Sequence, residues 1–383
     1  MSRGRILHVI DGLGMGGAEQ LLPRYLPKLA EQGFDPGVIV LQGRDSLRMR
    51  PALAQARVPV QLVEVSRLRH ATQIAAFLRT VGHLKPDLIH THLEFASLLG
   101  ALAGRIFGRP VVSTLHTLDA PGLSSRGDMR RWLMYRALSN WTDRVICLTQ
   151  GNADIARASG LGRAPVVILP NGVATTPYDG PVDVLGLRAS LGIPQDAPLA
   201  ITVCVLRPEK GVDVLIDAFP QALAAVPGAH LLIVGDGPER DRLTALARAS
   251  SVADRIHFAG YRTDVAHLLR IADLFVLATL FDAQPTVIME AMAARLPVVA
   301  SDFAGVPDMV TAGETGLLVP PGDPAALAEA MVPFLRDRAL ARAYGAAGRQ
   351  RLEEDFSLDR QIGKLGLLYD ELIGQNGGSS CGS

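Results

Sequence analysis

Short apolar runs alternate with segments of helical periodicity along almost the whole chain, and this alternation constrains the fold more than any other feature. Strands that alternate with helices in this way are typical of a parallel sheet covered by helices on both faces. We therefore expect a doubly wound α/β fold. In the first half, the expected strands lie near 5–10, 37–41, 58–65, 87–91, 110–115, 144–148 and 166–169, with helices near 72–83 and 95–107.

A segment dense in proline, glycine and asparagine, from Leu169 to Pro181, interrupts this pattern. Such a composition marks turns and linkers. The α/β pattern then repeats, with strands near 199–206, 231–234, 256–258, 274–277, 297–300 and 316–319. We therefore expect an N-terminal Rossmann-like domain at 1–175, a C-terminal Rossmann-like domain at 176–357, a last helix at about 358–375 and a flexible tail at 376–383.

Composition limits the compartment and the partners. The 383 residues suit two or three domains. Lys and Arg together number 38, as do Asp and Glu, so no global field attracts nucleic acid. The three cysteines, Cys147, Cys204 and Cys381, are too scattered for a disulfide framework, and we expect Cys147 and Cys204 to be buried thiols in a reducing compartment. The apolar run at 6–10 is too short for a signal peptide, and no run approaches the roughly 18 residues of a spanning helix. We expect a cytoplasmic protein.

The most specific motif runs from Asp282 to Glu290. The apolar run at 274–277 ends in a loop, the loop opens a helix near Thr286, and a second apolar run follows, which makes one βαβ unit. The first turn of that helix leaves backbone N–H groups unpaired at the positive end of the helix dipole, where a phosphate binds well. Asp282 on the loop and Glu290, about two turns into the helix, bracket this site.

This block resembles the signature of the family 4 retaining glycosyltransferases, which have the GT-B fold. The shared features are a carboxylate, seven residues and then a Glu near the start of a helix. The resemblance implies two domains facing an interdomain cleft and a nucleotide-sugar donor, with Asp282 near the sugar and Glu290 on the ribose. It also implies that the helix start faces the donor's diphosphate, through Pro285, Thr286 and Val287. The first acid is usually Glu in that family, so Asp282 is a departure.

A glycine-rich turn follows the first expected strand. Gly12, Gly14 and Gly17 satisfy G-x-G-x-x-G, a dinucleotide-binding fingerprint, so an NAD-dependent oxidoreductase remains an alternative, as does a turn without a ligand. A dinucleotide site requires an acidic residue closing the second strand, but that strand ends in Gln42, with Asp45 three residues later. The family resemblance implies another ligand, the donor's phosphates and sugar, held by Gly16, Gly17 and Glu19.

Two positively charged residues, Arg207 and Lys210, follow the first expected strand of the second half. The point charge of Lys210 and the planar fork of Arg207 suit the oxygens of a diphosphate. The family usually has an Arg where Val205 stands, and we expect Arg207 to take over its task. A surface salt bridge is the alternative for either charge. The resemblance adds three donor-side residues, Gly235, Tyr261 and Arg262.

Three histidines follow strand ends: His90, His92 and His116. They raise the question of a metal site. However, we expect His90 and His92 to point to opposite faces of their strand, and no carboxylate or cysteine has ligand spacing, so we expect no metal. The resemblance implies that His116 lies near the donor sugar and the reacting centre. A hydrogen-bonded loop histidine is the alternative.

Arginines interleave with aromatic residues at 126–144. A basic helix with aromatic residues can lie on a membrane surface. An amphipathic helix packed on a sheet has a similar composition. Peripheral contact with the inner face of the membrane therefore stays open as a hypothesis.

Together these motifs predict a retaining hexosyltransferase that moves a sugar from a nucleoside diphosphate sugar, UDP being favoured over GDP, to a hydroxyl. The family association favours a lipid-linked or saccharide acceptor in cell-surface polysaccharide synthesis, such as lipopolysaccharide. The expected catalytic residues are His116, Arg207, Lys210 and Asp282, with no metal or other cofactor. Besides the oxidoreductase, a catalytically idle homologue that binds a nucleotide sugar remains open.

Overall fold

The chain divides into two compact units. The first comprises Met1–Pro170 with Leu358–Ser383, and the second comprises Asn171–Ser357. The division falls after Pro170, whereas the sequence analysis placed the boundary after residue 175. The structure is a computed structural model that describes residues 2–14, 17–43, 49–67, 70–116, 125–162, 165–282 and 284–378.

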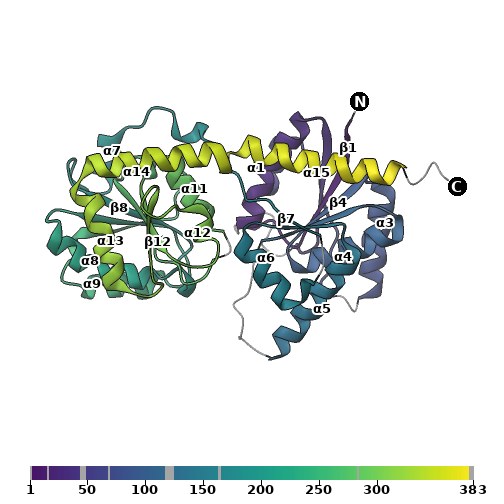
Figure 1. Cartoon of the computed structure of the whole chain (residues 1–383), viewed down its shortest axis with the longest axis horizontal. Coiled ribbons are helices and arrows are strands. Elements are labelled where there is room, and N and C mark those ends of the chain that lie inside the picture. The colour runs from purple at the N-terminus through teal and green to yellow at the C-terminus, as the bar shows by residue number, and fades with distance from the viewer. Residues whose placement is uncertain are drawn as a thin grey trace. The chain divides into compact units, whose positions relative to one another are not determined.

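The first unit is built on a parallel sheet (Figure 1). Its seven described strands follow the order β3-β2-β1-β4-β5-β6-β7. In β1, side chains on both faces are buried, as parallel sheets require. β3 lies at the edge of the sheet and is largely exposed, so it is shorter than the strand expected at 58–65. The strands are β1 (Gly4–Ile10), β2 (Phe34–Val40), β3 (Val60–Leu62), β4 (Leu88–His92), β5 (Val111–Leu115), β6 (Arg144–Cys147) and β7 (Val166–Ile168).

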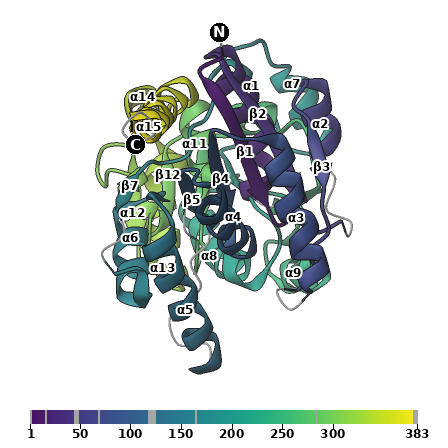
Figure 2. The same ribbon diagram turned by 90° about the vertical axis from the view of Figure 1, so that its right-hand side faces the viewer.

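Helices cover both faces of this sheet. Helices α3 and α4 pack on the face that carries Leu7 and Val9, while α15 packs on the opposite face (Figure 2). Helix α1 is continuous although Pro23 and Pro27 lie inside it. The helices of the first unit are α1 (Gly17–Glu31), α2 (Arg50–Gln55), α3 (Ala71–Leu84), α4 (Glu94–Phe107), α5 (Ser125–Trp141), α6 (Gln150–Ala156) and α15 (Leu358–Gly378).

Helix α15 belongs to the first unit although it follows the second unit in the chain. Tyr369 is fully buried and meets the Phe34 ring edge to face at 5.6 Å. Ion pairs fix the helix at its surface, from Arg3 to Asp370 and, at 2.6 Å, from Arg144 to Glu371. Three residues of the expected tail, 376–378, are helical, and 379–383 lie outside the described residues.

The second unit repeats the architecture on a parallel sheet of six described strands, in the order β10-β9-β8-β11-β12-β13. The strands are β8 (Leu199–Val203), β9 (His230–Val234), β10 (Ile256–Gly260), β11 (Leu274–Leu277), β12 (Val298–Ser301) and β13 (Gly316–Val319). The helices are α7 (Val184–Ser190), α8 (Val212–Ala225), α9 (Arg240–Ala249), α10 (Val265–Arg270), α11 (Thr286–Ala293), α12 (Val306–Met309), α13 (Pro324–Arg336) and α14 (Arg338–Arg351).

Amphipathic spacing explains how these helices pack. In α8, the apolar positions Val212, Leu215, Ile216 and Phe219 recur at helical spacing and are all buried in one core with α13. The N-terminus of α13 is capped by Asp323, whose carboxylate accepts hydrogen bonds from the N–H groups of two following residues at 3.0 Å each. Local sequence signals therefore define both the faces and the ends of the helices.

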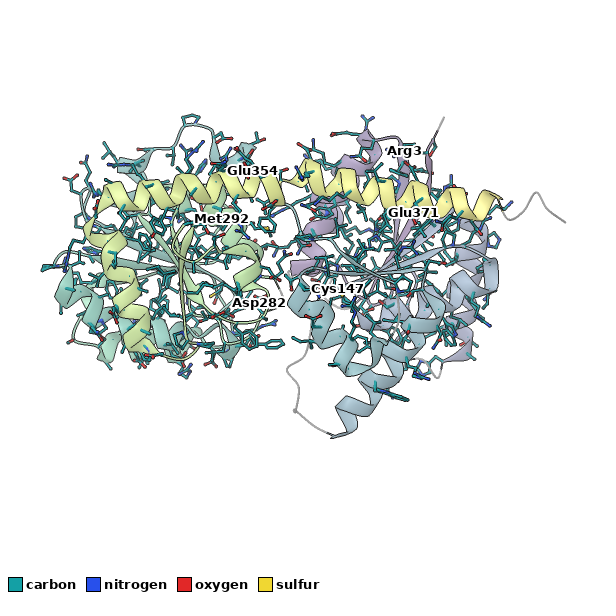
Figure 3. All side chains as sticks on the ribbon, viewed as in Figure 1. Arg3, Cys147, Asp282, Met292, Glu354 and Glu371 are labelled. Atoms are coloured by element: carbon teal, nitrogen blue, oxygen red, sulfur yellow. The ribbon has the colours of Figure 1, made fainter. Side chains whose placement is uncertain are left out.

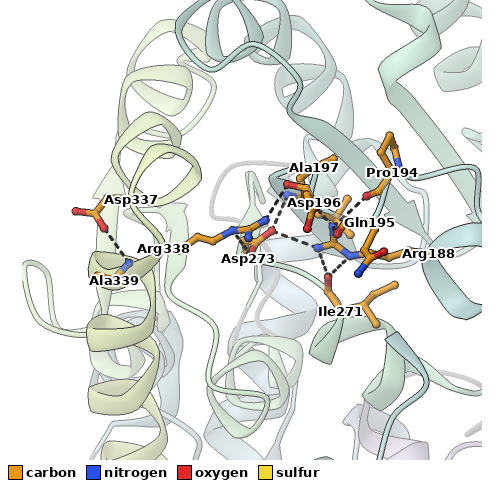
Figure 4. A network of polar contacts seen from close by, with 11 residues as sticks. Arg188, Pro194, Gln195, Asp196, Ala197, Ile271, Asp273, Asp337, Arg338 and Ala339 are labelled. Atoms are coloured by element: carbon orange, nitrogen blue, oxygen red, sulfur yellow. Dashed lines mark hydrogen bonds and ion pairs between the residues drawn. The ribbon is translucent and has the colours of Figure 1, made fainter. Parts of the chain in front are cut away.

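A buried arginine ties α7 to the strand ends of the second unit (Figure 4). The Arg188 guanidinium donates to the backbone oxygens of Ile271 at 2.6 Å and Ala197 at 2.8 Å. It also lies 3.3 Å from the Asp273 carboxylate, which in turn accepts the Leu199 N–H at 2.9 Å. These contacts satisfy polar groups at the amino-terminal ends of the strands, which would otherwise be buried without hydrogen-bond partners.

The expected doubly wound α/β architecture is confirmed in both units. All described strand pairs that form the two sheets are parallel, so the carboxyl ends of the strands meet at one edge of each sheet. That edge is where ligands bind in open α/β sheets. Within the described part of the chain, no helix has the length and apolar character needed to cross a membrane.

Candidate functional site

The carboxyl edge of the second sheet brings Lys210 and Asp282 together. Lys210 ends a short 3-10 helix after β8. Asp282 lies on the loop after β11 (Figure 3). Strands β8 and β11 are neighbours, so their loops adjoin. The Lys210 ammonium donates to the Asp282 carboxylate, and both side chains are about four-fifths buried. Two expected site residues, 72 positions apart, therefore form a charged pair at the ligand edge.

Backbone hydrogen bonds hold these two loops to each other. The Glu209 carbonyl accepts the Leu280 N–H at 2.8 Å and the Thr279 hydroxyl at 3.1 Å. Gly211, which follows Lys210, has φ +60°, and a Cβ there would lie 2.0 Å from the Ala278 carbonyl oxygen. Only glycine fits this close approach. The ammonium of Lys210 is therefore placed by a rigid double loop.

Arg207 lies at the same edge but is more exposed. Its side chain is 59% exposed, and its guanidinium is 3.8 Å from the Glu209 carboxylate. Val205, which stands where the family usually has Arg, is also exposed. A weak surface ion pair leaves Arg207 able to turn toward a bound anion.

Helix α11 begins at Thr286, as expected, with Pro285 at its N-cap position. Among the described residues, no side chain caps this end. The positive end of the helix dipole therefore remains available to an anion near the Lys210–Asp282 pair. Val287 and Glu290 are partly buried on this helix, while its other face packs in the core.

The loop after β9 approaches the loop after β8 closely. Gly235 has φ +133°, and a Cβ there would lie 1.8 Å from the Cys204 carbonyl oxygen. Its N–H donates to the Gly260 carbonyl at the end of β10, at 2.9 Å. Next to that carbonyl, the Tyr261 side chain is 60% exposed and free of the core. The expected base-side residues thus share one edge of the sheet.

Arg262 forms an ion pair with Asp264. Its guanidinium donates to both oxygens of the Asp264 carboxylate, at 2.7 and 2.5 Å. These hydrogen bonds raise the pKa of Arg262 and lower that of Asp264. A bidentate pair of this kind holds the guanidinium in a fixed place.

In the first unit, the glycine-rich turn lies between β1 and α1. Asp11, at the end of β1, accepts the N–H groups of Ala96 at 2.6 Å and Phe95 at 3.4 Å, so it caps α4. Gly17 opens α1 and Glu19 lies partly buried in its first turn. Gly16 lies outside the described residues. Asp11 lies 84 positions before Phe95, so no local capping signal in the sequence indicates this contact.

His116 directly follows β5 and is joined to a buried histidine cluster. Its Nε2 is 3.0 Å from Nδ1 of His92. Burial lowers the pKa of His116 to about 4, so its imidazole is neutral at pH 7. A neutral imidazole at a strand end can donate or accept a hydrogen bond, depending on its tautomer.

The expectation that His90 and His92 face opposite sides of their strand is wrong. Residues two apart on a strand point to the same face, and these two rings lie 4.3 Å apart. They gather with His8 of β1, which the sequence analysis did not single out. Within the described residues, these three histidines form the one group that has the nitrogen spacing to hold a metal ion. Strand parity places His8 on the same side of β1 as Ile6 and Ile10, and the register of β1 with β4 shows that this side is the histidine face.

The segment 126–144 coincides largely with α5. Met134 and Tyr135 are buried, while Trp132 and Trp141 are about two-fifths exposed. The Arg136 guanidinium lies 5.7 Å from the Trp132 ring centre, which suits a cation–π contact. The helix is therefore anchored in the first unit and presents aromatic side chains at its surface.

Comparison with known proteins finds matches over both units. The chain matches the family described as Glycosyltransferase Family 4 at residues 15–176 and that described as Glycosyl transferases group 1 at 186–351. A phosphatidyl-myo-inositol mannosyltransferase of Mycobacterium leprae is 34% identical over 275 residues, which cover 69% of this chain and 68% of that protein.

Two further matches span nearly the full chain. The lipopolysaccharide core biosynthesis glycosyltransferase LpsE of Rhizobium meliloti is 29% identical over 345 residues, 89% of this chain and 92% of that protein. The crystal structure of Anabaena Alr3699/HepE in complex with UDP-glucose superposes with a TM-score of 0.82 at 26% identity, covering 94% of this chain and 99% of that one. By contrast, the chain spans 66% of the length of a glycogen synthase of Mycobacterium tuberculosis, at 30% identity.

Proposed function

Because the chain belongs to glycosyltransferase family 4 and has the GT-B fold, we propose that it moves a hexosyl group from a nucleoside diphosphate sugar to a hydroxyl with retention of configuration. The bond from the sugar's C1 to the diphosphate oxygen breaks, and a bond from C1 to the acceptor oxygen forms. The acceptor's hydroxyl proton passes to the leaving diphosphate. The products are the glycoside and the nucleoside diphosphate.

The observation that carries this proposal is the Lys210–Asp282 pair beside the start of α11. The departing diphosphate gains negative charge in the transition state. An ammonium, the exposed guanidinium of Arg207 and a helix N-terminus all favour that charge, and such preorganised groups usually supply the largest part of catalysis. In this proposal no metal ion is required.

Asp282 has two tasks in this proposal. It holds the Lys210 ammonium in place before the donor binds, through the ion pair already present. It then accepts a hydrogen bond from a hydroxyl of the donor sugar. Asp is one methylene shorter than the usual Glu of the family, so the carboxylate reaches less far, and we propose that this selects the sugar that is transferred.

The remaining site residues divide between the nucleotide and the sugar. We assign the ribose to Glu290 and the nucleobase side to Gly235, Tyr261 and Arg262. The sugar and its phosphates contact His116 and, in the glycine-rich turn, Gly16, Gly17 and Glu19. The diphosphate lies on the backbone at Pro285, Thr286 and Val287. All of the described strand-end residues in this assignment lie at the carboxyl edges of their sheets, which supports it.

UDP is the nucleotide we favour, because the Anabaena protein of known structure was solved with UDP-glucose and is 26% identical to this chain. The acceptor we favour is a saccharide or lipid-linked saccharide of the cell surface, since the Rhizobium relative acts in lipopolysaccharide core biosynthesis. Peripheral contact with the membrane through 126–144 would serve a lipid-linked acceptor, and the exposed Trp132 and Trp141 are compatible with it.

Ligand binding tests the nucleotide. Thermal stabilisation is measured with UDP, GDP, ADP and NAD, on the wild type and on Lys210→Ala. We expect UDP to stabilise the wild type and to lose most of its effect in the variant, because the ammonium is removed. An Arg336→Ala variant, which changes an exposed charge on α13, is the matched control. Stabilisation by NAD alone would overturn the proposal in favour of an oxidoreductase.

Turnover tests the transfer itself. Release of UDP is followed from UDP-sugars with and without saccharide acceptors. Acceptor-dependent release supports the transferase. If UDP binds tightly and the donor is never consumed with any acceptor, the chain is an idle nucleotide-sugar-binding homologue, an alternative motivated by Asp282 and Val205.

A further inference from the structure

Four histidines line one face of the first sheet. His8 lies on β1, His90 and His92 on β4, and His116 just after β5. The strand register places His8 opposite His90 and Thr114 opposite His92. Paired residues of parallel strands share a face, so these side chains lie on the face covered by α15. They form a polar row inside an otherwise apolar layer.

Three of these imidazoles are linked in series. His8 Nδ1 is 3.0 Å from His92 Nε2, and His92 Nδ1 is 3.0 Å from His116 Nε2. His90 stands outside this series, because its two ring nitrogens are hydrogen-bonded to the Tyr369 hydroxyl at 2.5 Å and the Thr114 hydroxyl at 2.7 Å. Each link of the series therefore needs one N–H and one lone pair.

The protonation state makes the series directional. His8, His92 and His116 are neutral at pH 7, because burial lowers the pKa of each: to about 3 for His8, to about 4 for His116, and well below the usual value for His92. A neutral imidazole carries one N–H and one lone pair. The N–H groups must then all point toward His116 or all point away from it.

The buried end of the series selects the direction. His8 Nε2 is buried and has no hydrogen-bond partner among the described residues. If the N–H groups pointed away from His116, this atom would be a buried N–H without an acceptor. If they point toward His116, it is only an unused lone pair. Buried N–H groups without partners are the rarer of the two in proteins.

We propose that His8 and His92 hold His116 in the Nδ1–H tautomer, so that His116 offers a hydrogen-bond donor to an oxygen of the bound sugar nucleotide. This inference rests on the proposed function, which places His116 beside the donor. In it, His8 and His92 are positioning residues that act through His116. The tautomer usual for an exposed histidine, Nε2–H, would instead present an acceptor at Nδ1.

A metal ion bound by His8, His90 and His92 would contradict this arrangement. It would take the lone pairs that the series uses, and it would displace the Tyr369 or Thr114 contact of His90. No carboxylate takes part in this group to balance the charge of an ion in a fully buried place. The hydrogen-bonded series therefore accounts for the geometry better.

Nuclear magnetic resonance reads the tautomer directly. The full chain is labelled with 15N-histidine, and two-bond 1H–15N spectra are recorded at pH 7 without ligand. The His116 ring is assigned by its loss in His116→Gln. We expect a protonated Nδ1 and an unprotonated Nε2. A protonated Nε2 would overturn the inference, as would one equivalent of metal found in the purified protein by elemental analysis.

Variants test the role of His92. His92→Met breaks the series, and we expect His116 to revert to the Nε2–H form and kcat to fall by on the order of tenfold. His92→Gln, whose amide both accepts and donates, should restore most of the activity and the tautomer. His90→Met is the matched control, since His90 is equally buried but outside the series, and it should leave the His116 tautomer unchanged.

The outcomes separate this inference from the proposed function. If the wild type shows the Nδ1–H form of His116 and His92→Met loses it, but no sugar donor is ever turned over, the tautomer assignment stands and the transferase fails. If transfer occurs and His116 keeps the same tautomer in His92→Met, the inference fails alone. Should His92→Met not fold, the wild-type spectrum decides.

Discussion

Arg188, a buried arginine of the second unit, allows a quantitative test of how that unit is stabilised. Replacing Arg188 with Met keeps much of the apolar stem and removes the guanidinium. The side chain is only 5% exposed, so the groups that it contacts lie away from bulk solvent. The substitution strips hydrogen bonds from the backbone oxygens of Ile271, at 3.1 and 2.6 Å, and of Gln195 and Ala197, at 2.9 and 2.8 Å (Figure 4).

The expected cost follows from the groups left behind. Removing one partner of a buried charged network typically destabilises by about 3–5 kcal/mol, because the remaining carboxylate and carbonyls stay buried. For a unit of this size, 1 kcal/mol corresponds to roughly 2–4 °C in melting temperature. We therefore expect Arg188→Met to lower the melting temperature of the second unit by on the order of 10 °C.

Differential scanning calorimetry and urea unfolding provide the assay. Arg338→Met is the matched control, because Arg338 contacts the same Asp273, at 3.7 Å, from an exposed position. Such a surface ion pair contributes about 1 kcal/mol or less. If Arg188→Met and Arg338→Met melt at the same temperature, burial does not make the contribution of Arg188 to stability larger than that of an exposed arginine, and the reasoning is refuted.

Four further predictions concern the site and pH. Lys210→Ala should lower kcat by about 10²–10³-fold, whereas Cys147→Ala, in the buried core, should leave it within a few-fold; equal turnover would remove Lys210 from the site. Asp282→Glu should shift the preference among UDP-sugars, measured as kcat/KM for each, and an unchanged ranking would show that the shorter acid is not a specificity device. Gly211→Ala should weaken UDP binding in calorimetric titration, because its Cβ would lie 2.0 Å from a backbone oxygen; unchanged affinity would contradict the double-loop geometry. Burial lowers the pKa of His8 from 6.5 to about 3, so the unfolded chain binds more protons than the folded chain between these pH values. The free energy of unfolding should therefore fall by about 1.4 kcal/mol per pH unit for each such histidine as the pH drops below 6.5. Equal stability to urea at pH 7 and pH 5 would argue against neutral buried imidazoles.

The architecture could be predicted because its signals are local. Apolar runs and helical periods identify strands and helices one by one, and parallel sheets follow from their alternation. The start of α11 at Thr286 and the strands Leu274–Leu277 and Gly316–Val319 lie where the sequence placed them. Comparison with known proteins then confirms the family that the Asp282 to Glu290 block indicated.

The contacts within the site could not be predicted in the same way, because they depend on strand order. Lys210 meets Asp282 only because β11 lies beside β8 in the sheet, although two strands, β9 and β10, separate β8 from β11 in sequence. The contact between the His8 and His92 rings likewise needs β1 beside β4. The alternation of side chains along a strand can be read from the sequence, and it places His90 and His92 on one face. The expectation of opposite faces was an error, and the row of histidines therefore became evident only from the strand register.

The placement of α15 has a consequence for how the protein is made. The ribosome completes residues 171–357 before it synthesises the helix that covers His90 and Phe34. The second unit can therefore fold while the sheet face of the first unit that α15 covers is still exposed to solvent. Synthesis of this last helix is therefore the step that completes the first unit.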